Sequence, residues 1–228
     1  MGNLIFSFKD KKIKNLKNPK NILGGKGANL AEMTRLGIPV PPGFTLTTKV
    51  CTHYMNNGEF PSQLKNQLMK SLLRIEATMD QQFDSASNPL LVSVRSGARK
   101  SMPGMMETVL NVGLTSKTLP GLIQQSGDER FVYDSYRRLI TMYSDVVMEK
   151  TLGLKSKGGK GIREKLELIL EDYKSTHNYT IDADLTAEDL KIISDRYKNC
   201  VTDILGQDFP DDATTQLWGA ITAVFKSW

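Results

Sequence analysis

The residues best suited to chemistry lie in a basic, glycine-containing segment at positions 93–108, SVRSGARKSMPGMMET. The segment follows an apolar run at 90–94 and places Arg95, Arg99 and Lys100 among small residues. Small residues let backbone N–H groups come close to a ligand, and the arginine fork matches phosphate oxygens. The pattern therefore indicates a polyphosphate site. The alternative is an ordinary basic surface loop after a buried strand.

A second cluster, Gly24–Gly27, holds Lys26 among three glycines just before a predicted helix. Free N–H groups, the positive end of the helix dipole and the ammonium group would all attract an anion there. The cluster is not a P-loop, because the spacing Gly-x-x-x-x-Gly-Lys-Ser/Thr is missing. Residues 158–161, with Lys160, have the same composition and also precede a helical pattern. The four-residue pattern is therefore not specific by itself.

Other catalytic patterns do not occur in the sequence. The two histidines, His53 and His177, have no metal-binding spacing, and we interpret both as packed or solvated residues. The two cysteines, Cys51 and Cys200, form no metal-like or redox-like pair and are expected to be free thiols. There is no Gly-x-Ser-x-Gly nucleophile motif. The sequence thus offers no candidate metal ligand.

The composition is that of a soluble protein with a sizeable core: 228 residues, of which 39% are hydrophobic and 24% charged. No apolar run approaches the roughly 20 residues that span a bilayer, and the N-terminus does not resemble a signal peptide. We therefore expect a cytoplasmic protein without a membrane partner. The net charge of +5 suits an anionic ligand or nucleic acid. Six lysines crowd residues 9–20 without interleaved aromatic residues for base stacking, so we expect a solvated loop and consider nucleic acid an unlikely partner.

The first half of the chain mixes strand and helix patterns. Helical spacing runs from Gly27 to a capping Gly37, and from a cap at Thr47 or Thr48 to Gly58. A longer helical pattern covers 62–83. The apolar, β-branched runs predict strands at 4–8, 44–46, 90–94 and 109–112.

The second half, from about Ser116, is almost entirely helical. Apolar stripes predict helices over 128–150 and from Ile162 onward, separated by a charged linker at 155–161. Thr186 and Asp189 have the spacing of a capping box that would start a helix running to about Leu205. The last helical stretch is 211–228. The whole pattern predicts an α+β fold.

Three segments together resemble the N-terminal nucleotide-binding domain of pyruvate, phosphate dikinase. The first is residues 24–44, from GGKGANLAEM to LGIPVPPGF, and the second is 92–114, with MPGMM and LNVGL. The third runs from Phe209-Pro210 to Ala223-Val224-Phe225-Lys226-Ser227-Trp228. The related phosphoenolpyruvate synthases share the Gly-Gly-Lys-Gly start and a Val-Arg-Ser but lack the Met-Pro-Gly-Met-Met run. The resemblance covers the whole chain.

The resemblance implies an ATP-grasp-like nucleotide-binding domain, present in part, with an inserted helical subdomain. The expected α+β nucleotide-binding subdomain comprises residues 1–114 and 199–228, and the expected helical insert is 115–198. In this family, Mg-ATP donates its β-phosphoryl group to a histidine on a separate domain, while inorganic phosphate accepts the γ-phosphoryl group. The phosphohistidine then carries its group to pyruvate, so that pyruvate and phosphoenolpyruvate interconvert.

Carried over to this sequence, the family implies that Lys26 and Arg95 contact the phosphates of ATP, with Arg95 as the catalytic cation. The loop 101–108 would cover the polyphosphate with its backbone N–H groups. The residues expected to bind the nucleotide there are Ser101, Gly104, Met106 and Thr108. Their role would be electrostatic, because they neutralise and orient the transferring group.

The sequence departs from the family in what it contains. The histidine-bearing domain and the pyruvate-binding domain are missing, and the acidic ligands of Mg²⁺ are expected outside this chain. We therefore expect the chain alone to be inactive. The alternatives are a non-catalytic module that binds a nucleotide or a partner protein and, less favoured, a basic helical module that binds nucleic acid.

Overall fold

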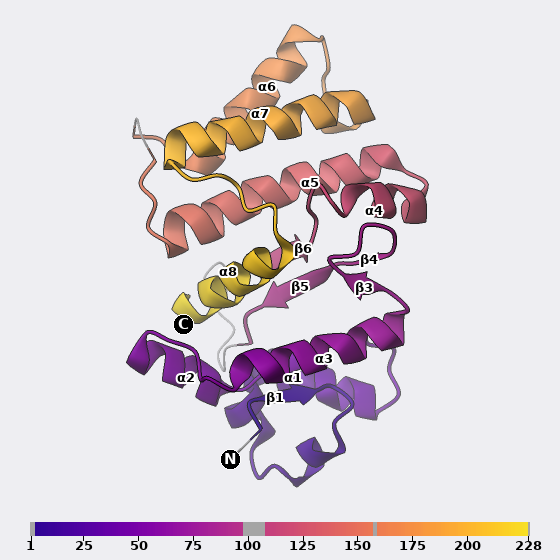
Figure 1. Cartoon of the computed structure of the whole chain (residues 1–228), viewed down its shortest axis with the longest axis vertical. Helices are drawn as coiled ribbons and strands as arrows, with labels where there is room; N and C mark the ends of the chain where they lie inside the picture. The colour runs from indigo at the N-terminus through magenta and orange to yellow at the C-terminus, as the bar shows by residue number, and fades with distance from the viewer. Residues whose placement is uncertain (1–2, 98–107, 157–158, 228) are drawn as a thin grey trace. The chain divides into compact units, whose positions relative to one another are not determined.

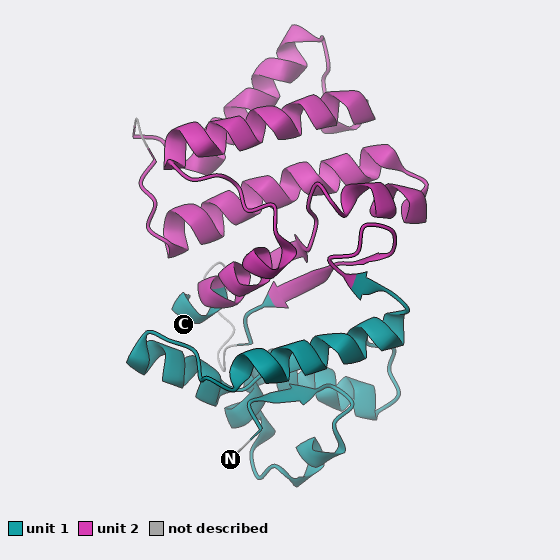
Figure 2. Cartoon of the chain, in the orientation of Figure 1, with its two compact units in different colours: residues 1–82, 95–107, 224–228 teal, residues 83–94, 108–223 magenta. Residues whose placement is uncertain are grey.

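The computed structural model describes residues 3–97, 108–156 and 159–227 (Figure 1). The chain divides into two compact units, each made of stretches that are separate in the sequence (Figure 2). Unit 1 comprises residues 1–82, 95–107 and 224–228, and unit 2 comprises residues 83–94 and 108–223.

Unit 1 contains one antiparallel pair of short strands and several helices. Strand β1 (Ile5–Ser7) pairs with β2 (Phe44–Leu46), with Ile5 opposite Leu46 and Ser7 opposite Phe44. The helices are the 3₁₀-helix η1 (Lys11–Asn15), α1 (Pro19–Arg35), α2 (Thr48–Asn57) and α3 (Leu64–Met79). Both predicted strands are confirmed, and α2 ends at Gly58, as its sequence predicted.

Residues 9–21 are not the loop that their polarity predicted. The 3₁₀-helix η1 begins after Asp10, whose carboxylate accepts a 2.9 Å hydrogen bond from the backbone N–H of Lys12. Helical turns begin at Pro19, because the fixed φ of proline suits a first helical turn. The helical segment predicted from Gly27 follows a break at Gly24 within α1. The few apolar side chains of this stretch pack against the core of Phe6, Leu23 and Ala28; they are Ile13, Leu16 and Ile22. Three apolar residues among many lysines make too weak a periodic pattern to predict these helical turns.

Helix α3 is shorter than its predicted range of 62–83. Its core face consists of Leu64, Leu68 and Leu72, which are all buried. Asp80 ends the helix, because its φ of 53° lies in the left-handed region. The next residues form strand β3 (Gln82–Phe83), which pairs with β4 (Pro89–Leu90).

Unit 2 combines strands with a set of packed helices. Strand β5 (Val92–Arg95), whose last residue belongs to unit 1, forms a two-stranded sheet with β6 (Thr108–Val112). The helices that follow are α4 (Leu119–Ser126), α5 (Glu129–Tyr143), the π-helix η2 (Ser144–Thr151), α6 (Ile162–Thr176), the 3₁₀-helix η3 (Asp182–Asp184), α7 (Ala187–Leu205) and α8 (Ala213–Lys226). Helix α4 had no counterpart among the predicted elements. The predicted helix 128–150 is α5 continued by a π-helical segment.

Helices α5 and α7 lie side by side in unit 2 (Figure 1). The chain just before α7 is held to α5 by Arg130, which donates to the carbonyl oxygens of Leu185 and Asp182 at 2.7 Å each. Arg137, only 6% exposed, pairs with Asp134 at 2.5 Å and with the Asp182 carboxylate at 3.1 Å. Because a buried guanidinium needs acidic partners, these ion pairs fix the turn at η3 relative to α5.

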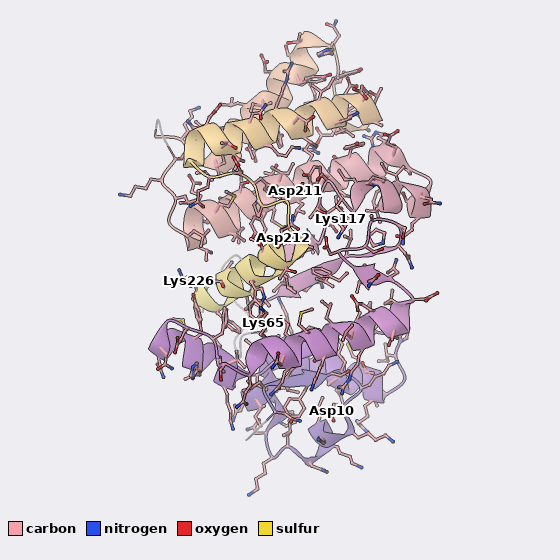
Figure 3. The ribbon with its side chains drawn as sticks, viewed as in Figure 1. Asp10, Lys65, Lys117, Asp211, Asp212 and Lys226 are labelled. Atoms are coloured by element: carbon pink, nitrogen blue, oxygen red, sulfur yellow. The ribbon has the colours of Figure 1, made fainter. Side chains whose placement is uncertain are left out.

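The start of α8 is joined to the end of β6 by one buried side chain. The Gln216 side chain, 0% exposed, accepts from Gly113 N–H at 3.0 Å and donates to the Leu114 carbonyl at 3.1 Å. Nearby, Asp211 accepts hydrogen bonds from the amide and hydroxyl of Ser116 (Figure 3). These bonds join residues 113–116 to residues 211–216, and both stretches belong to unit 2.

The observed mixture of helices and small sheets is an α+β fold, as predicted. The two compact units have boundaries other than 1–114, 115–198 and 199–228, and that division stays a prediction about family architecture. None of the described helices is long and apolar enough to cross a membrane.

The predicted capping box at the start of α7 is confirmed. The Thr186 hydroxyl accepts from Asp189 N–H at 3.2 Å, and the Asp189 carboxylate accepts from Thr186 N–H at 2.9 Å. The same carboxylate also accepts from the hydroxyls of Tyr173 and Tyr179, at 2.7 and 3.0 Å. Burial alone would raise the pKa of Asp189, but the hydrogen bonds from Thr186, Tyr173 and Tyr179 outweigh it and lower the pKa to about 2.

We expect Asp189→Asn to destabilise the protein by about 1 kcal/mol at neutral pH, because the charged cap of α7 is lost. The folded-state pKa lies below the ordinary aspartate value of 3.8, so this stabilisation is present above about pH 4 and disappears as the pH falls towards about 2. Thermal unfolding of both proteins between pH 2 and pH 6 measures the difference. A difference of equal size at both ends of that range would contradict the role of the charge.

Candidate functional site

The glycine cluster at 24–27 lies at a break in helix α1. Gly24 has φ 70° and ψ 176°, inside an element whose other residues are helical. Only glycine adopts this conformation readily. The break starts a new helical segment, so the N–H groups of the residues after Gly24 are at a helix N-terminus, as the sequence predicted.

The two basic glycine segments meet at Gly24 and Gly97, both within unit 1. The backbone N–H of Gly25 donates a 3.0 Å hydrogen bond to the carbonyl oxygen of Gly97. A Cβ added to Gly24 would lie only 1.7 Å from that oxygen, and one added to Gly97 would lie 3.6 Å from the carbonyl oxygen of Leu23. The absence of a side chain at Gly24 therefore allows this close backbone contact, while a Cβ on Gly97 would be in ordinary van der Waals contact.

The lysine and the arginine of the two segments flank this contact. Lys26 follows Gly25 directly, and Arg95 is the last residue of β5, two positions before Gly97. Both side chains are exposed. No acidic side chain in the described parts of the chain forms an ion pair with either of them. Two exposed cations on joined segments can bind one external polyanion.

The position of the Lys26 segment is fixed from its other side by strand β2. A Cβ added to Gly27 would lie 2.6 Å from the hydroxyl oxygen of Thr45, so α1 packs directly on the strand. The Thr48 hydroxyl donates a 2.7 Å hydrogen bond to the carbonyl oxygen of Asn21, in the first part of α1. Sequence reasoning did not identify Gly97 or Thr45 as supports. The available signals were the glycine two residues after Arg95 and the glycine that follows Lys26.

The structure leaves several predicted nucleotide-binding residues untested. Ser101, Gly104 and Met106 lie outside the described residues. Thr108 is the first residue of β6 in unit 2, where its side chain is half-buried. Their proposed part in covering a polyphosphate stays a prediction.

The similar cluster around Lys160 has a different environment. The Lys160 ammonium pairs at 2.8 Å with Glu164, which lies in the first turn of the helix that follows. The N-terminus of that helix, α6, is capped by the Glu149 carboxylate, whose oxygens accept from Ile162 N–H at 3.1 and 3.2 Å. An acidic side chain thus already occupies the place that an anion would take.

The two histidines lie in or next to helices. The ring of His177 stacks on Tyr173, with centroids 4.1 Å apart, and its Nδ1 lies 2.8 Å from the Tyr173 carbonyl oxygen. His53 lies within α2. The described residues contain no group of three or more His, Cys, Asp or Glu side chains that could hold a metal ion.

Comparison with known proteins matches this chain to the family model "Pyruvate phosphate dikinase, AMP/ATP-binding domain" over residues 20–67 and 55–228. The chain belongs to this family. Both glycine segments, with Lys26 and Arg95, lie inside the matched residues. The chain is therefore homologous to the AMP/ATP-binding domain of pyruvate, phosphate dikinases.

Individual pyruvate, phosphate dikinases from bacteria and plants are similar over nearly the whole chain. The protein of Clostridium symbiosum is 44% identical over 211 residues, covering 92% of this chain and 23% of the relative. That of Rhizobium meliloti (strain 1021) is 43% identical over 230 residues, covering 100% of this chain and 24% of the relative. The chloroplastic protein of Flaveria pringlei is 43% identical over 226 residues, covering 98% of this chain and 22% of the relative. The chain thus spans about a quarter of the length of these curated relatives.

We expect Gly24→Ala to destabilise unit 1 by about 3 kcal/mol or more. The sum combines about 1–3 kcal/mol for a conformation that alanine rarely adopts with about 1–3 kcal/mol for overpacking against Gly97. Gly37→Ala is the matched control, because Gly37 also has a positive φ, 78°, but nothing lies within 4 Å of an added Cβ. Urea unfolding of the two variants compares the costs. Equal losses would show that the contact with Gly97 adds nothing beyond backbone strain.

Proposed function

We propose that this chain binds the polyphosphate of ATP, as the nucleotide-binding part of a pyruvate, phosphate dikinase. The observation that carries the proposal is the hydrogen bond from Gly25 N–H to the Gly97 carbonyl. This bond holds the segment of Lys26 against the segment of Arg95, so that both exposed cations can act on one ligand. The family to which the chain belongs, described as an AMP/ATP-binding domain, supports the same assignment.

In the proposed site, Lys26 and Arg95 bind and orient the triphosphate. The lysine supplies a compact charge, while the planar arginine fork can contact two phosphate oxygens at once. The N–H group of Gly25 is bonded to Gly97, and the N–H groups of the residues that follow it would add donors at a helix N-terminus. The loop 101–108 would cover the polyphosphate through the backbone at Ser101, Gly104, Met106 and Thr108.

The activity proposed for the whole enzyme is the interconversion of pyruvate and phosphoenolpyruvate. The β-phosphoryl group of ATP would pass to a histidine on a separate domain, with inorganic phosphate as the acceptor of the γ-phosphoryl group. The contribution of Lys26 and Arg95 to this reaction is electrostatic: they offset the negative charge of the transferring group and hold it in line. Arg95 is the residue we propose to act during transfer.

The ATP-grasp-like architecture, with residues 115–198 as a helical insert, is part of the same proposal, as is a cytoplasmic location. Mg²⁺ would neutralise phosphate charge when bound with ATP. The described residues contain no metal-binding cluster, and the roles given above to Lys26 and Arg95 rest on their charge and exposure.

We expect Lys26→Ala and Arg95→Ala each to weaken ATP binding by about ten- to a hundredfold. A charge-assisted hydrogen bond contributes about 1.5–3 kcal/mol, and about 1.4 kcal/mol corresponds to a tenfold change in Kd. Isothermal titration with Mg-ATP measures the change. The control is Lys160→Ala, which removes an exposed lysine that already pairs with Glu164.

The control variant should bind ATP as the unchanged protein does. Equal losses for Lys26→Ala and Lys160→Ala would refute the assignment of the site to the Gly24–Gly97 contact. A nucleotide that binds without any loss in either Lys26→Ala or Arg95→Ala would place the ATP site elsewhere.

A further inference from the structure

The net charge of the protein is concentrated in one short segment. The whole chain has 30 Lys and Arg residues against 25 Asp and Glu residues, a net charge of +5. Residues 9–20, which we call the lysine segment, contain six lysines and Asp10, a net charge of +5 as well. Over the rest of the chain the numbers of cations and anions are equal.

All six lysines of the segment are exposed; they are Lys9, Lys11, Lys12, Lys14, Lys17 and Lys20. No described acidic side chain forms an ion pair with any of them. The single acid, Asp10, caps the 3₁₀-helix η1 through the N–H of Lys12 (Asp10 is labelled in Figure 3). The positive charge is thus not neutralised within the described part of unit 1.

The lysine segment has a fixed shape rather than that of a free tail. Ile13 and Leu16 pack against the core of unit 1, so the backbone between Lys11 and Lys17 is anchored while the lysines face solvent. In a 3₁₀-helix, side chains three positions apart lie above one another with a rise of about 2 Å per residue. The ammonium-bearing chains of Lys11 and Lys14 therefore leave the backbone about 6 Å apart.

We infer that the lysine segment is a docking surface for an acidic α-helix of a partner protein. Carboxylates at positions i and i+3 or i+4 of an α-helix are about 5–6 Å apart, which matches the spacing of Lys11 and Lys14. Double-stranded nucleic acid is less favoured, because the segment offers no arginine or aromatic residue to contact bases. An anionic membrane would gain only electrostatic attraction from the segment, because its apolar residues Ile13 and Leu16 pack against the core and cannot insert.

The test uses three Lys→Gln changes in the lysine segment, at Lys11, Lys14 and Lys17, in the otherwise complete chain. We call this protein the lysine-segment variant. The control changes three exposed lysines elsewhere in unit 1, at Lys49, Lys65 and Lys70, and so removes the same charge. The probe is an alanine-based helical peptide of about 20 residues, with glutamate at every fourth position. Binding is measured by fluorescence anisotropy at low and at physiological salt.

We expect the unchanged protein and the control to bind the peptide. The lysine-segment variant should bind about tenfold more weakly, as expected for the loss of three exposed ion pairs. Binding should weaken as salt rises. An equal loss in the control would overturn the proposal, since net charge alone would then explain binding. Tighter binding to a DNA duplex or to vesicles with anionic lipid than to the peptide would overturn it in favour of those partners. ATP affinity should be unchanged in the lysine-segment variant, which separates this inference from the proposed function.

Discussion

The close approach of Gly24 to Gly97 is the contact on which the candidate site depends. It holds together two segments whose lysine and arginine repel each other. A hydrogen bond of 3.0 Å and the packing of Gly27 on Thr45 hold the segments in place without any ligand. The cations are thus positioned by backbone geometry, so a polyanion does not have to bring them together on binding.

The chain contains a natural comparison for this arrangement. Lys26 and Lys160 both lie among glycines before a helix, yet only Lys160 has an acidic partner among the described residues, Glu164. Glu149 also caps the helix that follows Lys160. Chemical composition is the same at the two places, and the difference in their capacity for an anion comes from the acidic side chains around them.

Local patterns predicted much of the fold, because they act over a few residues. The leucines at 64, 68 and 72 and the capping box of Thr186 and Asp189 were read directly from spacing. Helices η1 and α4 escaped prediction. Helix η1 has few apolar residues, and these stabilise it only by packing against the core formed by Phe6, Leu23 and Ala28. Helix α4 is too short, at 8 residues, for its periodicity to stand out.

The sequence by itself determined the family of this chain, most of its helices and strands, and the two basic glycine segments. Residue identity and spacing contain that information. Only the tertiary structure decided that Gly97 meets Gly24, that Lys160 is paired, and that the lysines of residues 9–20 stand exposed on an anchored turn. These facts depend on contacts between residues far apart in the chain, and such contacts follow from packing and from the absence of a side chain at a given point rather than from any local pattern.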